Sequence, residues 1–330
     1  MTKSQIIIEQ FHSQALEGNP LNDPAARRVP VYLPPGYDPG RAYPSVYLLT
    51  AFAARGMKLL NDDLWQENIQ ERLDRLTTSG EIQPMIVVMP DASTRYGGSQ
   101  YLNSPATGLY EDHLLEFVQF IDSKYPTRQQ AGQRAVMGHS SGGYGALRLG
   151  MSHSGTFGLI AAHAPDLSFE LVYQKDFSHF LRYYEKAGEE GILEMLADPG
   201  KALEKGASFY ALAVCAMASC YSPNPGSPWG FDLPFDLYTG EIIPDIWQRW
   251  QANDPIHLAA DYREALQSLD LFYLDCGIYD EENLLYGARI LTRKFDSLEI
   301  PYHYEEFEGG HRNTRFRYDV SLKLISETFG

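Results

Sequence analysis

The sequence is poor in cysteine and has fewer basic than acidic residues. The 330 residues include three cysteines, Cys215, Cys220 and Cys276. This low and odd number argues against a disulfide framework. No His or Cys partner stands at zinc-site spacing near Cys215 and Cys220, so we expect no metal. The 27 Lys and Arg against 43 Asp and Glu give a net charge of −16, which disfavours binding to nucleic acid or anionic membranes.

Long hydrophobic runs are also missing. No stretch approaches the roughly eighteen apolar residues of a transmembrane helix. The start of the chain, MTKSQIIIEQFHSQALEGNP, has only three consecutive isoleucines where a signal peptide has a longer apolar region. These absences predict a cytoplasmic protein that binds neither nucleic acid nor membrane, and they leave its oligomeric state open.

Strand-like and helix-like segments alternate along the chain. The apolar run MIVVMP at 85–90 is typical of a strand buried on both faces. Residues 110–121 carry apolar side chains at the spacing of an amphipathic helix. A further helix is expected after residues 62–63, with Trp65, Ile69, Leu73 and Leu76 on one face. The alternation predicts an α/β fold, with a mostly parallel central sheet and helices on both faces.

The alternation breaks between residues 166 and 255. Helical segments there are followed by a loop rich in proline, glycine and aromatic residues. We therefore expect one domain over 1–330, with a largely helical cap insertion at 166–255. Six aromatic residues of the insertion line the site or form the insertion's own small core: Trp229, Phe231, Phe235, Tyr238, Trp247 and Trp250.

The stretch GHSSGG at 138–143 fits the G-x-S-x-G pattern of a nucleophilic serine. Ser140 has Gly138 and Gly142 at the required positions, whereas Ser141 would need glycine where His139 stands. An apolar strand, RAVM, precedes the motif and a helix-like segment follows it. Ser140 is therefore the expected nucleophile, and the alternative is a structural glycine turn. The N–H of Ser141, at the helix start, is the expected oxyanion donor.

A nucleophilic serine needs a base and an acid, which follow it in the order acid, then histidine. His311 lies at the glycine turn FEGGH after the last strand, so it is the expected base. His303 lies within that strand, and His139 is expected to point away from the turn.

The acid should follow the preceding strand, and LDCGIYDEEN places Asp280 just beyond it. Asp275 lies inside the strand and would be buried short of the site. Glu281 and Glu282 are interpreted as acids in the first turn of the next helix.

Five segments in this order carry a family resemblance: VYLPPGYDPGRAYPSVYLLT, MPDASTRYGGSQYLNS, GHSSGGYGALRLGM, LDCGIYDEEN and FEGGH. Together they resemble the esterase family of α/β hydrolases, which contains esterase D (S-formylglutathione hydrolase), the feruloyl esterases, the enterochelin-esterase-like proteins and the antigen 85 mycolyltransferases. The likeness covers about residues 30–165 and 269–330, and it is weak or absent in the insertion. It implies an α/β-hydrolase fold with Ser140, Asp280 and His311 as the triad.

The resemblance also implies an oxyanion loop and a cleft. The family's loop usually reads His-Gly-x, whereas this chain has Thr50-Ala51-Phe52, so the backbone N–H of Phe52 is the expected donor and Ala53 the alternative. The segment GGSQYLNS resembles the one that lines the cleft. The candidate substrate contacts are Tyr101, Asn103 and Ser104 of this segment, with Asp166 and Trp229; the first three could instead pin a loop by hydrogen bonds.

These residues predict a serine carboxylesterase that hydrolyses small acyl or aryl esters through an acyl-enzyme, without metal or organic cofactor. Its partner is a small-molecule ester. An acyltransferase would share every catalytic residue and differ in what accepts the acyl group. A serine peptidase is less expected because no large extra domain is present. A non-catalytic binding protein on the same scaffold is the alternative of a different class.

Overall fold

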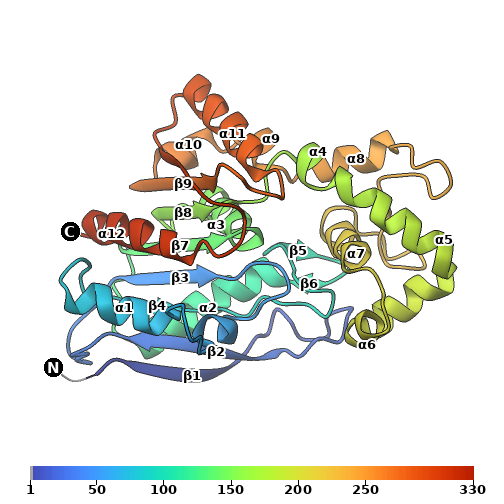
Figure 1. The fold of residues 1–330 in the computed structure, drawn as a ribbon. Coiled ribbons are helices and arrows are strands. Elements are labelled where there is room, and N and C mark those ends of the chain that lie inside the picture. Colours follow the sequence, from blue (N-terminus) through green and yellow to red (C-terminus); the bar gives the residue numbers. More distant parts are fainter. Residues whose placement is uncertain (1–2) are drawn as a thin grey trace.

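Eight strands form one sheet in the order β1-β2-β4-β3-β7-β8-β9-β10 (Figure 1). The structure is a computed structural model and describes residues 3–330. The strands are β1 (Gln5–His12), β2 (Ala26–Leu33), β3 (Ser45–Leu49), β4 (Ile86–Val88), β7 (Arg134–His139), β8 (Leu159–His163), β9 (Leu271–Gly277) and β10 (His303–Phe307). The pairs of β2 with β1 and β4 are antiparallel, and all other pairs are parallel.

Hydrophobic residues on successive positions of the central strands point to two cores. Val46 and Leu48 of β3 face one core with helices α1 (Ile69–Thr78) and α12 (Tyr318–Thr328). Tyr47 and Leu49 face the other core with α2 (Tyr110–Lys124), α3 (Ser141–Ser152) and α11 (Leu284–Leu298). A strand covered on both faces needs apolar residues at every position, which explains the continuous runs. The predicted α/β-hydrolase fold, with helices on both faces of a mostly parallel sheet, is confirmed.

The two helices expected from periodicity differ in outcome. Helix α2 begins at Tyr110 and buries the apolar positions expected of it. The expectation for Trp65 is wrong: α1 begins only at Ile69, and Trp65 lies in the preceding loop with 87% of its surface exposed. The reason is a capping box, in which the Asn68 side chain accepts from the Glu71 N–H and the Glu71 side chain accepts from the Asn68 N–H.

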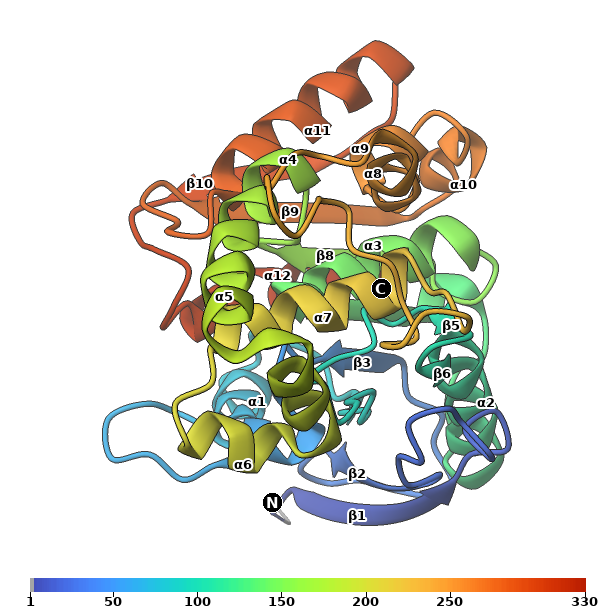
Figure 2. The ribbon, with the colours of Figure 1, turned by 90° about the vertical axis from the view of Figure 1, so that its right-hand side faces the viewer.

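Between β8 and β9 the chain forms a group of helices, most of which lie at the end of the sheet toward which the parallel strands point (Figures 1 and 2). They are α4 (Phe169–Val172), α5 (Gln174–Ala197), α6 (Pro199–Glu204), α7 (Phe209–Tyr221), α8 (Pro244–Gln251), α9 (Pro255–Leu258) and α10 (Arg263–Gln267). Residues 166–255 of this group are called the cap below. Short elements complete the chain: η1 (Gly56–Leu60), β5 (Asn103–Ser104), β6 (Gly108–Leu109), η2 (Ala131–Gln133) and η3 (Arg315–Arg317).

The turn from β7 into α3 holds its serine in a strained conformation. Ser140 has φ 59° and ψ −126°, a region that non-glycine residues rarely occupy. The turn also brings α3 very close to β3. A Cβ on Gly142 would lie 2.6 Å from the Leu49 carbonyl oxygen and 2.8 Å from that of Thr50. Glycine at 142 therefore allows the approach that supports the strained serine.

We expect Gly142→Ala to lower the free energy of unfolding by about 1–3 kcal/mol, because the added methyl group meets backbone that cannot move away alone. Gly155→Ala is the matched control, since a Cβ there has no atom within 4 Å. Urea unfolding of both variants measures the difference. Equal stability of Gly142→Ala and the wild type would contradict the close packing of this turn.

Candidate active site

Side chains from three strand ends meet at the carboxyl edge of the sheet. Ser140 follows β7, Asp280 follows β9 and His311 follows β10. The Nε2 atom of His311 lies 3.0 Å from the Ser140 Oγ, and its Nδ1 atom lies 2.9 Å from the Asp280 Oδ2. These are the two hydrogen bonds that a nucleophile, a base and an orienting acid require. The structure thus brings together the three residues that the sequence predicts as a triad.

The carboxylate of Asp280 is buried, and several N–H groups donate hydrogen bonds to it. The Asp280 side chain is fully buried, and its Oδ1 accepts the backbone N–H groups of Glu282 (3.0 Å) and Leu284 (3.2 Å). Burial alone would raise the pKa of Asp280, but the hydrogen bond and charge of His311 outweigh it and hold this pKa below its ordinary value. Asp280 is therefore a carboxylate at neutral pH and can orient His311.

The loops that carry the acid and the histidine are hydrogen-bonded to each other. The Glu281 carboxylate accepts the backbone N–H of His311 at 2.7 Å, and the Tyr279 N–H donates to the Gly309 carbonyl at 2.9 Å. Gly310 permits this approach, since a Cβ there would lie 2.7 Å from the Glu281 carboxylate. The expectation that Glu281 and Glu282 lie in the first turn of a helix is wrong, because α11 begins only at Leu284.

The ring of His139 lies against the ring of His311, with centroids 4.6 Å apart and planes inclined by 37°. The expectation that His139 points away is therefore wrong. Burial, together with the nearby charges of His311 and His163, lowers the pKa of His139 to about 3. A neutral ring beside His311 packs against it without repelling its protonated form. Its adjacency to the nucleophile was visible in the sequence, but its direction was not.

A second Ser–His–Asp chain lies beneath the first. The Nδ1 atom of His163 lies 2.8 Å from the Asp275 Oδ1, and its Nε2 lies 2.9 Å from the Ser321 Oγ. All three residues are almost fully buried, and Arg317 donates to the same Asp275 carboxylate. Substrate cannot reach Ser321, so this chain is structural. It agrees with the expectation that Asp275 is buried short of the site.

Two backbone N–H groups, of Phe52 and Ser141, remain the candidate oxyanion donors. Ser141 N–H is at the first position of α3, where N–H groups have no partner within the helix. Of the two candidates in the oxyanion loop, Ala53 N–H already donates to the Gly97 carbonyl at 3.2 Å. No backbone partner is found for Phe52 N–H within residues 3–330. The geometry therefore favours Phe52 over Ala53.

Asp166 is buried, and its side chain is hydrogen-bonded to residues from three segments of the chain. Its Oδ2 accepts from the Gln100 Nε2 (3.0 Å), the Tyr173 hydroxyl (2.9 Å) and the Ser141 hydroxyl (3.3 Å). Only 5% of the residue is exposed, and this burial raises its pKa against the effect of those hydrogen bonds. That Asp166 contacts substrate stays a prediction. The hydrogen bonds show that Asp166 links Tyr173 of the cap to the residue that follows the nucleophile.

The three candidates from the segment GGSQYLNS pin loops. The Tyr101 hydroxyl donates to the Thr50 carbonyl at 2.5 Å, so this buried residue supports the oxyanion loop. The Asn103 side chain accepts two backbone N–H groups at the start of α2. The Ser104 hydroxyl donates to the Ser219 carbonyl of α7. Their side chains are thus occupied by protein partners, which is the alternative that the sequence had left open.

The cap aromatics pack mainly against one another. Trp229 contacts the rings of Phe180, Tyr184 and Phe231, with centroids 6.1–6.2 Å apart. Trp250 is fully buried, whereas Tyr238 is 96% exposed. Apart from Tyr238, the six aromatic residues of the insertion therefore belong to its own core, and Trp229 packs against that core.

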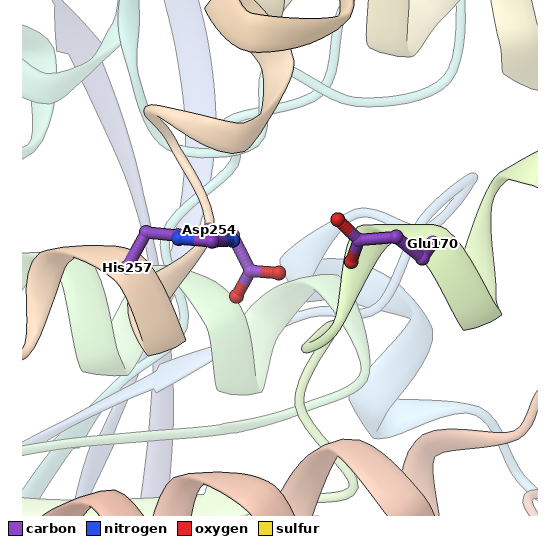
Figure 3. Close-up of side chains that lie close together, drawn as sticks. All are labelled: Glu170, Asp254 and His257. Carbon is purple, nitrogen blue, oxygen red and sulfur yellow. The ribbon is translucent and has the colours of Figure 1, made fainter.

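One cluster outside the site has residue types that metal ions prefer. Glu170, Asp254 and His257 bring ligand atoms within 4.8 Å of one another, and the two carboxylates face each other (Figure 3). Both Asp254 oxygens, however, already accept backbone N–H groups, from Ile256 at 3.0 Å and Phe169 at 2.8 Å. Burial raises the pKa of Asp254 to about 6. We attribute the cluster to the anchoring of α4 and α9.

The surroundings of His311 also set its pKa. Burial opposes the charged ring, but the hydrogen bond and charge of Asp280, with a further contribution from Asp166, raise the pKa of His311 above 6.5. A histidine whose pKa is raised by folding stabilises the protein fully below pH 6.5, and that contribution is lost as the pH rises through the folded-state pKa.

We therefore expect NMR titration to give His311 a pKa above 6.5, and Asp280→Asn to lower it, because the carboxylate charge is removed while the side chain keeps its size. His311→Gln identifies the resonance. The test fails if His311 titrates at or below 6.5 in the wild type, or if its pKa is the same in Asp280→Asn.

Comparison with known proteins shows to which family this chain is related. The model of the Esterase family ("Putative esterase") matches residues 24–325. Esterase Rv1288 of Mycobacterium tuberculosis is 26% identical over 320 residues, which cover 94% of this chain and 57% of that protein. Endo-1,4-beta-xylanase Y of Acetivibrio thermocellus is 35% identical over 97 residues, which cover 29% of this chain and 8% of that protein. The chain thus spans at most a little over half the length of these relatives.

Solved structures share the fold. A ferulic acid esterase superposes with a TM-score of 0.62 at 20% identity, over 99% of this chain and 100% of that one. An S-formylglutathione hydrolase of Staphylococcus aureus superposes with a TM-score of 0.61 at 12% identity, over all of both chains. No helix in residues 3–330 is long and apolar enough to cross a membrane. With its family model matched over nearly the whole chain, the protein belongs to the esterase family of α/β hydrolases.

Proposed function

We propose that this protein is a serine carboxylesterase acting on small esters. The observation that carries the proposal is the pair of hydrogen bonds that links Asp280 through His311 to Ser140, on a strained turn between a strand and a helix. Family membership and the named esterases among the relatives support the same activity.

In the proposed first step, Ser140 Oγ attacks the ester carbonyl carbon while His311 Nε2 takes the hydroxyl proton. The N–H groups of Phe52 and Ser141 hold the carbonyl oxygen as it becomes negative. Loss of one such donor typically costs about 10²–10³ in rate. The tetrahedral intermediate then breaks its bond to the leaving oxygen, which receives the proton from His311. The result is an acyl group on Ser140 and a free alcohol.

In the second step, water gives a proton to His311 and attacks the acyl carbon. The bond from that carbon to Ser140 Oγ then breaks, and His311 returns the proton to the Oγ, which releases the acid and restores Ser140. Asp280 keeps the Nδ1 proton of His311 in place and stabilises the charged ring in both steps. The neutral ring of His139 limits the rotation of His311. Neither step requires a metal ion or an organic cofactor.

The cap is proposed to be part of the site. Lys175 of α5 pairs with Glu282 beside the acid, and the Asn283 side chain donates to the Leu171 carbonyl at 3.1 Å. The hydroxyl of Ser141, next to the nucleophile, donates to Asp166 at the start of the cap at 3.3 Å. These contacts support a cap at 166–255 that borders the site. The three buried, unpaired cysteine thiols support the proposed cytoplasmic location.

The test is hydrolysis of p-nitrophenyl acetate, butyrate and octanoate by the wild type, Ser140→Ala and Ser141→Ala. We expect Ser140→Ala to lower kcat/KM by about 10⁴-fold or more. Ser141→Ala should keep activity within about tenfold of the wild type, because its backbone N–H is unchanged and only the hydroxyl contact with Asp166 is lost.

Activity of Ser140→Ala equal to the wild type would exclude the proposed nucleophile. A folded wild type that hydrolyses none of the three esters would contradict the proposed function and favour an acyltransferase or a binding protein. Acyl transfer to an added alcohol, measured in the same reactions, separates those two.

A further inference from the structure

A cleft of about 440 Å³ lies beside the proposed triad. One wall comes from the cap, with Asp176 and His179 on α5 and Tyr210 on α7. The other wall comes from the residues next to the triad, Glu281 and Arg312 among them. Cap helix α5 and the loop after β9 thus both line this cleft.

The position of this cleft assigns it to one half of the substrate. His311 must give its proton to the leaving oxygen, so the leaving group has to lie on the His311 side of the scissile bond. Glu281 and Arg312 are the neighbours of Asp280 and His311 in the chain, which puts the cleft on that side. The space beside the oxyanion donors Phe52 and Ser141 is only about 10 Å³, too small for a bulky group.

Three polar side chains of the cleft have no hydrogen-bond partner among the described residues. Within residues 3–330, the side chains of Asp176, Tyr210 and Arg312 make no hydrogen bond or ion pair, although Tyr210 stacks on His179 with centroids 4.8 Å apart. Lys175 and Glu282, also in the lining, pair with each other. The free groups are thus a carboxyl that accepts, a guanidinium that donates and a phenol that does both.

This set of free groups discriminates between leaving groups. A hydrocarbon alcohol would cover the carboxyl and the guanidinium without replacing their water, which is costly. An alcohol that carries further hydroxyl groups would give each of them a partner. Sites built to bind a hydroxyl group reject analogues that lack it by large factors.

We propose that this cleft is the leaving-group subsite and that it selects esters of hydroxyl-bearing alcohols, bound by Asp176, Tyr210 and Arg312. The proposal rests on the proposed esterase function. It concerns the alcohol half of the ester and not the acyl half.

The test compares glycerol 1-acetate with n-propyl acetate, which share the acyl group and the three-carbon skeleton and differ by two hydroxyl groups. We expect the wild type to prefer glycerol 1-acetate about tenfold or more in kcat/KM. Asp176→Ala and Arg312→Ala should each lower this ratio several-fold, and the double variant should bring it close to one. Because propyl acetate uses the same His311, the ratio cancels any effect of Arg312→Ala on the histidine.

Arg293→Ala is the matched control, since Arg293 is exposed on α11 and does not line the cleft. It should keep the ratio of the wild type. Equal rates on both esters in the wild type, or a preference that survives in the folded double variant, would overturn the subsite. If p-nitrophenyl acetate is hydrolysed through Ser140 while the ratio is one, the subsite fails and the esterase proposal stands. If no ester is hydrolysed, both fail.

Discussion

The hydrogen bond between Asp280 and His311 is the contact on which the rest of the site depends. It joins two loops that follow neighbouring parallel strands, β9 and β10, so the register of the sheet fixes how far apart the two side chains start. Glu281 then holds the same histidine by its backbone N–H. Asp280 thus holds the ring of His311 and Glu281 holds its backbone, and these two contacts orient the ring toward Ser140.

The residues around this contact divide into an upper and a lower layer. The lower layer, His163 with Asp275 and Ser321, has nearly the same hydrogen bonds as the proposed triad but lies out of reach of any substrate. Burial and the charges of His311 and His163 lower the pKa of His139, so a neutral ring lies against His311. Accessibility and backbone strain at Ser140, rather than the three residue types alone, distinguish the candidate site.

Features that depend on neighbouring residues could be predicted from the sequence, whereas features that depend on contacts between distant segments could not. The turn around Ser140 was predictable because its glycine spacing is set by local clashes, as at Gly142. The partners of Ser140 were predictable because parallel strands bring their carboxyl ends to one edge. The direction of the His139 ring was not predictable, since it depends on where the loop that carries His311, 172 positions further along the chain, comes to lie. The partners of Asp166 come from three separate segments, at residues 100, 141 and 173, and no repeated pattern in the sequence encodes that they meet.

The central claim is that Ser140 is an activated nucleophile, and covalent labelling with a fluorophosphonate followed by peptide mass spectrometry tests it most directly. The account predicts one label per chain, on Ser140, formed rapidly by the native protein. Labelling should be much slower in His311→Ala, which lacks the base. A label on Ser141 or another residue, or a labelling rate unchanged in folded His311→Ala, would contradict the account.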